Sequence, residues 1–137
     1  MRGVPLFLLL LALSACSLFG PSGPHYVVFF QERSAQLDAP ARGVIARVAR
    51  CANAEPASPV EIRGYTDSFG SPQADVLLSR ERVRSVARER VRSVADALVA
   101  DGVAASRLVR TGHGQAGANP GVASRRVEIN VGGHSCV

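Results

Sequence analysis

The sequence predicts an α/β sandwich of the α+β type, in which helices pack on one face of a mixed β-sheet. Two observations lead to this prediction. Short apolar segments rich in β-forming residues recur along the chain, and two longer segments between them carry apolar residues at helical spacing. In chain order the predicted elements are strand, helix, strand, helix, strand and strand. The length of 137 residues is typical of one domain.

Four segments are predicted to be strands. Residues 26–30 form a continuous apolar run, as expected of a buried strand. Residues 60–65 and 125–131 alternate apolar or small residues with polar ones, which indicates strands with one face toward a core. Residues 107–111 form the remaining strand. The glycine-rich segment 112–121 is predicted to be the loop after it.

Two segments are predicted to be helices. Asp38 followed by Pro40 is a typical helix start, and this helix is expected to reach about residue 52. The second helix is expected over residues 73–100 and to end at Gly102. It contains a perfect tandem repeat, because residues 80–87 and 88–95 both read RERVRSVA. We interpret the repeat as a duplication that lengthens the helix by about 12 Å; the alternative is that one copy loops out.

The N-terminal segment 1–15 is predicted to be a secretory signal peptide. Arg2 provides a positive start, and the apolar run 4–13 is shorter than the roughly 20 residues of a membrane-spanning helix. Residues 13–16 read Leu-Ser-Ala-Cys and resemble the lipobox of bacterial lipoproteins, which implies cleavage before Cys16 and lipidation of its thiol. Ser17 in place of Asp implies sorting to the outer membrane. The alternative is an ordinary signal peptide followed by a chance cysteine.

The mature chain is expected to have two parts. Residues 16–24 are the lipidated cysteine and a short linker rich in Gly, Pro and Ser, and residues 25–137 are the folded domain. Besides Cys16, the chain contains Cys51 and Cys136. In an oxidising periplasm they predict one structural disulfide. Two free buried cysteines and a catalytic thiol are the alternatives.

The composition favours an acidic partner and argues against nucleic acid. The net charge is +5, and the 16 basic residues are all arginine. In an exported protein a basic surface suits anionic lipid head groups or wall polymers, and no basic patch with interleaved aromatic residues is present. His25, His113 and His134 lack the spacing of metal ligands. No nucleophile elbow or phosphate-binding glycine loop occurs, so we predict no enzyme, cofactor or metal.

Four short motifs follow one another along the chain. They are Gly-Tyr-Thr-Asp at 64–67, then Gly70, then Leu-Ser-Arg-Glu-Arg at 78–82 and Ser-Arg-Arg-Val at 124–127. In this order they resemble the OmpA-like peptidoglycan-binding domain, which includes the Pal lipoproteins, over residues 26–131. The resemblance implies the OmpA-like fold. It also implies non-covalent binding of peptidoglycan through the diaminopimelate of the stem peptide.

The resemblance also implies which residues bind. Asp67 is expected on the ammonium and Arg82 on the carboxylate of diaminopimelate, because a guanidinium matches a carboxylate. Thr66, Gly70 and Asp75 complete the expected site. Taken singly, Asp67 could be only a turn residue and Arg82 only a solvated helix charge. The repeat leaves a second choice: counted forward from Asp67 the clamp is Arg82, and counted backward from the end of the helix it is Arg90. We assign Arg82, because the site is expected at the N-terminal end of the helix.

Three positions depart from the family pattern. Tyr65 stands for the usual His, Asp75 for the usual Asn and Ser124 for another Asn. The charge of Asp75 could hold the ammonium or repel the carboxylate. The expected role is that of an outer-membrane lipoprotein that faces the periplasm and tethers membrane to wall. The alternative is an envelope scaffold with the same fold, a degenerate wall site and other envelope proteins as partners.

Overall fold

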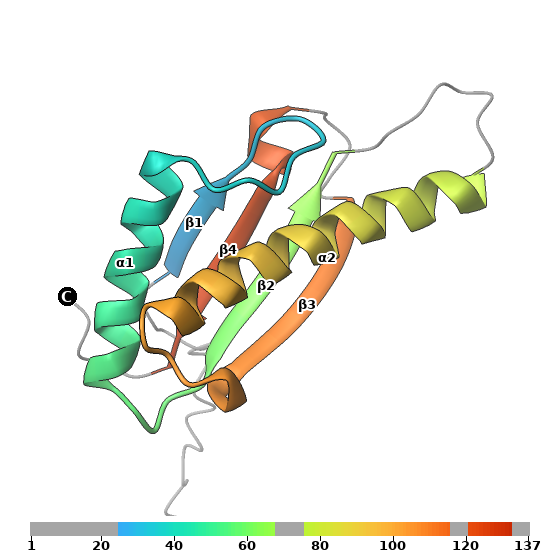
Figure 1. Cartoon of the computed structure of the whole chain (residues 1–137). Coiled ribbons are helices and arrows are strands. Elements are labelled where there is room, and N and C mark those ends of the chain that lie inside the picture. The colour runs from blue at the N-terminus through green and yellow to red at the C-terminus, as the bar shows by residue number, and fades with distance from the viewer. Residues whose placement is uncertain (1–24, 68–75, 116–120, 133–137) are drawn as a thin grey trace, which may run out of the picture.

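A computed structural model describes residues 25–67, 76–115 and 121–132. It contains a four-stranded sheet with two long helices on one face (Figure 1). The predicted fold class is therefore confirmed. In chain order the elements are β1 (His25–Phe29), α1 (Ala39–Ala54), β2 (Val60–Thr66), α2 (Val76–Ala100), η1 (Ala105–Arg107), β3 (Leu108–Gln115), η2 (Val122–Ser124) and β4 (Arg126–Val131).

The strand order in the sheet is β1-β4-β2-β3, so the last strand lies in the interior of the sheet. β4 pairs antiparallel with both β1 and β2, while β2 and β3 are parallel. Gly64 near the end of β2 is opposite Val127 near the start of β4. This register brings the residue that follows β2, Asp67, close to the residue that precedes β4, Arg125.

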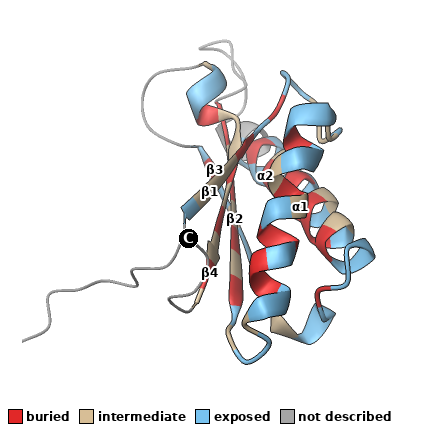
Figure 2. Cartoon of the chain, turned by 90° about the vertical axis from the view of Figure 1, so that its left-hand side faces the viewer, coloured by how far each residue is buried: buried red, intermediate tan, exposed pale blue. Residues whose placement is uncertain are grey.

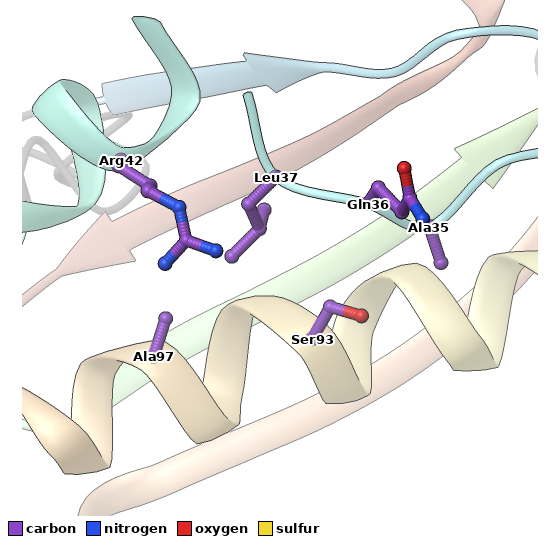
Figure 3. A pocket seen from close by; sticks show the side chains of 6 residues that line it. All are labelled: Ala35, Gln36, Leu37, Arg42, Ser93 and Ala97. Carbon is purple, nitrogen blue, oxygen red and sulfur yellow. The ribbon is translucent and has the colours of Figure 1, made fainter. Parts of the chain in front are cut away.

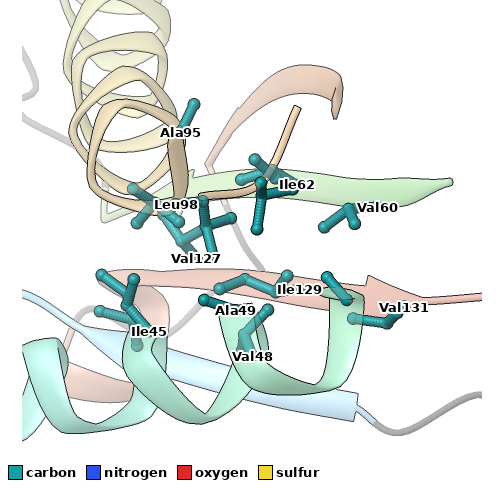
Figure 4. Packing of buried hydrophobic residues seen from close by; sticks show 14 of the residues in the cluster. Ile45, Val48, Ala49, Val60, Ile62, Ala95, Leu98, Val127, Ile129 and Val131 are labelled. Atoms are coloured by element: carbon teal, nitrogen blue, oxygen red, sulfur yellow. The ribbon is translucent and has the colours of Figure 1, made fainter. Parts of the chain in front are cut away.

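The core lies between the sheet and the helices (Figure 2). Alternate residues of β2 and β4 are buried, in the pattern expected of strands with one covered face. Their side chains pack against the apolar faces of both helices (Figure 4). Fully buried members of this cluster include Val60, Ile62, Val127, Ile129, Ile45, Val48, Val94 and Leu98.

Helix α1 begins as its sequence predicts. The side chain of Asp38 accepts a hydrogen bond of 2.8 Å from the backbone N–H of Ala41, and Pro40 lies in the first turn. The helix continues two residues beyond the expected end. Cys51 lies on the buried face of α1 and is disulfide-bonded. Cys136 lies outside the described residues, so its pairing with Cys51 stays a prediction.

The prediction of a loop from residue 112 is wrong over its first part, because β3 continues to Gln115. The glycines in this segment do not interrupt the strand. They allow α2 to lie close to the sheet. A Cβ atom on Gly112 would lie 2.8 Å from Cγ of Arg88, and Gly114 has a φ of 86°. The register also shifts between Gly64 and Tyr65, so that His113 is an extra residue in β3. The other strand ends agree with prediction to within one residue.

Helix α2 contains both copies of the repeat without interruption, so the alternative of a looped-out copy is wrong. Val83 and Ala87 of the first copy are buried, as are Val91, Val94 and Ala95 of the second. The N-terminal part of the helix runs past the end of β2 (Figure 1). Gly102, with a φ of 94°, follows the end of the helix as predicted.

In the parts of the chain that the structure describes, no helix combines the length and apolar character needed to cross a bilayer. The predicted signal peptide, Cys16 and the linker lie outside the described residues. Their assignments stay predictions.

Candidate functional site

Asp67 lies immediately after β2, at the edge of the core. It is only 8% exposed, and the preceding Thr66 is fully buried. The hydroxyl of Thr66 donates a hydrogen bond of 3.3 Å to Oδ1 of Asp67. Thr66 continues the alternation of β2 that buries every second residue, so the strand itself fixes the position of the carboxylate that follows.

Arg125 forms an ion pair with Asp67. One terminal nitrogen of Arg125 is 3.1 Å from Oδ2 of Asp67, and the two side chains are 17% and 10% exposed. Nε of Arg125 also donates to the carbonyl of Phe30, while the backbone N–H of Phe30 donates to the carbonyl of Arg125. The guanidinium is thus oriented by the end of β1 and directed at the end of β2. A partly buried charge-assisted bond of this kind is stronger than a surface pair.

Arg90 is a fully buried arginine in the second copy of the repeat. Its guanidinium donates hydrogen bonds to three carbonyls, of Ser34 at 2.8 Å, Gln31 at 3.0 Å and Tyr65 at 3.2 Å. It also lies over the ring of Phe30, 5.2 Å from the centroid. The side chain therefore connects α2 to the loop after β1 and to the end of β2.

The charges of Arg90, Arg125 and Asp67 interact. Burial lowers the pKa of Arg90, the carboxylate of Asp67 opposes this shift, and the positive charge of Arg125 adds to it. Arginine remains protonated in proteins, so the cluster has two cations and one anion. The excess positive charge attracts an anion, while the carboxylate of Asp67 offers a partner for a cation. A ligand that carries both charges matches this arrangement better than a simple acid or amine.

Arg82 lies elsewhere. It is exposed, and it lines a cavity of about 490 Å³ together with Arg33, Ser85 and Val86. Eight residues separate Arg82 from Arg90, or about 12 Å along the helix axis. The structure therefore brings Arg90 and Arg125, rather than Arg82, to Asp67. The reason is that α2 lies against the end of β2 where the two copies meet, with Ala87 and Val91 beside Gly64. Arg90 lies at this contact and bonds the carbonyl of Tyr65, while Arg82 lies two turns nearer the start of the helix.

Gly70, Asp75, Cys16 and Cys136 are also assigned from sequence, and all four lie outside the described residues. Their assigned roles stay predictions. Among the assigned binding residues that the structure describes, Thr66 and Asp67 lie at the end of β2, and Arg82 lies apart from them on α2.

Sequence reasoning assigns no role to Arg125, although the motif Ser-Arg-Arg-Val contains it. A usable signal is present, since this arginine immediately precedes a strand and Asp67 immediately follows one. Only the order of strands in the sheet shows that the two ends meet. Arg90 is the alternative assignment of the clamp, which counting back from the end of α2 provides.

The side chain of Tyr65 faces away from the Asp67 cluster. Its ring stacks on the ring of His113 at 5.0 Å, and the guanidinium of Arg126 lies 4.4 Å from the centroid of Tyr65. Tyr65 contacts Arg90 through its backbone carbonyl. The departure from histidine at this position therefore changes the open face of the sheet rather than the cluster.

A second cavity, of about 580 Å³, lies between the loop before α1 and the two helices (Figure 3). Arg42 is the charged residue among the described residues that line it, and none of them is acidic. The described lining of this cavity therefore does not pair opposite charges as the Asp67 cluster does. The described residues that line it are Ala35, Gln36, Leu37, Arg42, Ser93 and Ala97.

Several solved structures share this fold at low sequence identity. The OmpA-like domain of FopA1 from Francisella tularensis subsp. tularensis SCHU S4 superposes with a TM-score of 0.66 at 20% identity, over 78% of this chain and 73% of that one. The peptidoglycan-associated lipoprotein of Burkholderia pseudomallei has a TM-score of 0.62 at 17% identity, over 78% and 88%. The periplasmic domain of Helicobacter pylori MotB has a TM-score of 0.61 at 19% identity, over 77% and 69%.

No curated protein sequence matches this chain significantly. The sequence pattern of the OmpA family, by contrast, matches residues 29–130, which include β2, α2, β3 and most of β4. The match covers most of the chain and contains Asp67, Arg90 and Arg125. This chain therefore belongs to the OmpA family.

Proposed function

We propose that this chain is an outer-membrane lipoprotein that binds peptidoglycan non-covalently through the diaminopimelate of the stem peptide. At the level of the OmpA family, the function is binding to peptidoglycan rather than catalysis. The observation that supports the finer proposal is the ion pair of Asp67 and Arg125 beside the buried charge of Arg90.

The free end of diaminopimelate carries an ammonium and a carboxylate, and each finds a partner in this cluster. Asp67 takes the ammonium, and Arg125 takes the carboxylate with its partly exposed guanidinium. Arg90 is fully buried and already bonded to three carbonyls, so it acts by its charge and by holding the site together. When a zwitterion binds, Asp67 and Arg125 each have a group of opposite charge as partner.

The cellular role follows from the predicted lipid at Cys16. Residues 17–24 can span about 26 Å when fully extended, which limits how far the domain lies from the membrane. Each wall contact can be weak, since many anchors acting together give avidity. Labelling with radioactive palmitate, compared between wild type and Cys16→Ala, tests the anchor. Density-gradient separation of inner and outer membranes tests the location.

Co-sedimentation tests the wall site. The full-length protein in mild detergent is mixed with purified diaminopimelate-type peptidoglycan and centrifuged. We expect wild type to pellet, and Asp67→Asn and Arg125→Gln to remain in the supernatant. The matched controls are Asp96→Asn and Arg92→Gln, which alter an exposed ion pair of 3.8 Å on α2. Both controls should pellet like wild type.

Lysine-type peptidoglycan separates the diaminopimelate proposal from a general affinity for the wall. Its stem peptide carries the ammonium but lacks the neighbouring carboxylate. Equal pelleting of wild type with both wall types would contradict the assigned role of Arg125. If wild type pelleted with neither, the wall proposal would fail, and the envelope scaffold with a degenerate site would replace it.

A further inference from the structure

The described residues that line the cavity beside Arg82 come from two elements that are far apart in sequence. Arg33 comes from the loop after β1, while Arg82, Ser85 and Val86 come from the first copy of the repeat in α2. Residues 82, 85 and 86 are three and four apart, so they share one face of the helix. The described residues that line the cavity of about 490 Å³ are thus two arginines, a serine and a valine.

The two arginines of the cavity have little compensating charge. None of the four described residues that line it is acidic. Glu32 is 3.7 Å from Arg33, but both side chains are largely exposed, at 65% and 77%. Glu81 is paired instead with Arg84. Exposed ion pairs have small interaction energies, so these carboxylates compensate the two arginines only weakly. An anion that entered the cavity would therefore be attracted by both arginines.

The same loop joins this cavity to the Asp67 cluster. Arg90 holds the loop through the carbonyls of Gln31 and Ser34, and Arg33 lies between these two residues. Among the described residues, Arg33 is the one non-glycine residue with a positive φ, which is 53°. Left-handed backbone is uncommon for a residue of this kind. The hydrogen bonds of Arg90 on either side hold the turn that presents Arg33 to the cavity.

We propose that this cavity is a second anion subsite, which takes another carboxylate of the wall peptide that binds at Asp67. The proposal rests on the proposed function. The tandem repeat places Arg82 at the position equivalent to Arg90, about 12 Å away along the helix. An extended peptide covers this distance in roughly three to four residues. A stem peptide is long enough to place diaminopimelate at one site and a separate carboxylate at the other.

Calorimetric titration of the full-length protein in detergent tests the subsite with three ligands. They are free diaminopimelate, a stem tetrapeptide with all its carboxylates, and the same peptide with every carboxylate outside diaminopimelate amidated. The variants are Arg82→Gln and Arg33→Gln. The matched control is Arg80→Gln, an exposed arginine of the same repeat copy that does not line the cavity.

We expect wild type to prefer the carboxylate peptide over the amidated one by on the order of fivefold, as for partly solvated charge pairs. Arg82→Gln and Arg33→Gln should lose this preference, and Arg80→Gln should keep it. All variants should bind free diaminopimelate as wild type does. Absence of any preference in wild type, or its survival in Arg82→Gln, overturns the subsite alone. Failure of wild type to bind diaminopimelate overturns the wall proposal as well.

Discussion

Asp67 and Arg125 are 58 residues apart in the sequence and form an ion pair of 3.1 Å where the end of β2 meets the start of β4. The pair depends on the antiparallel register of these two strands, with Gly64 opposite Val127. It therefore joins the fold to the candidate site, since the contact that closes this corner of the sheet also contains the two charges of the proposed ligand site.

A double-mutant cycle should detect the Asp67–Arg125 pair as a stability contribution. We expect a coupling free energy of about 1–2 kcal/mol between Asp67→Asn and Arg125→Gln, because both side chains are mostly buried. Urea unfolding of wild type, both single variants and the double variant measures it. The exposed pair Arg92–Asp96 should give about 0.5 kcal/mol or less in the same experiment. Equal coupling in the two cycles would contradict the structure.

Replacing Arg90 by Lys should destabilise the protein although the charge is kept. A lysine ammonium cannot reproduce the planar fork that bonds the carbonyls of Gln31, Ser34 and Tyr65. We expect the free energy of unfolding to fall by about 2–3 kcal/mol. The loop should also open, so trypsin should cleave after Arg33 faster than in wild type. Arg88→Lys, an exposed position in the same repeat copy, is the control and should change neither quantity.

Two glycines should respond to alanine in opposite directions. A Cβ on Gly64 would lie 2.5 Å from the carbonyl oxygen of Ala87 and from a methyl group of Val91, so Gly64→Ala should destabilise the protein by about 3 kcal/mol. Gly43 lies in α1, where an added methyl group would meet nothing within 4 Å, and Gly43→Ala should stabilise by about 1 kcal/mol. Thermal unfolding checks both. A lower melting temperature for Gly43→Ala would show that α1 is not as described.

Tyr65→His restores the residue that is usual in the family, and we expect it to leave wall binding unchanged within about twofold. The ring of Tyr65 stacks on His113 and lies under the guanidinium of Arg126, while Arg90 of α2 contacts Tyr65 through its backbone carbonyl alone. Co-sedimentation at several peptidoglycan concentrations measures the affinity. A change as large as that of Asp67→Asn would mean that the ring contributes to the ligand site.

The local patterns of the sequence are sufficient for the elements. Asp38 and Pro40 start α1, alternation identifies β2 and β4, and Gly102 follows the end of α2, because each of these signals acts over a few residues. The exception is the segment that contains Gly112 and Gly114. Glycine there serves a close approach of strand and helix, which a pattern along one strand does not reveal.

The sequence by itself determined the fold class, the family resemblance and Asp67 as the acidic member of the candidate site. Tertiary structure alone decided which arginines accompany it. A perfect repeat makes Arg82 and Arg90 identical in local context, so no short-range signal distinguishes them. Packing does, because α2 docks on β2 around Ala87 and Val91, which buries Arg90 beside Tyr65 and leaves Arg82 exposed. Arg125 joins them because pairing between distant strands brings it to Asp67.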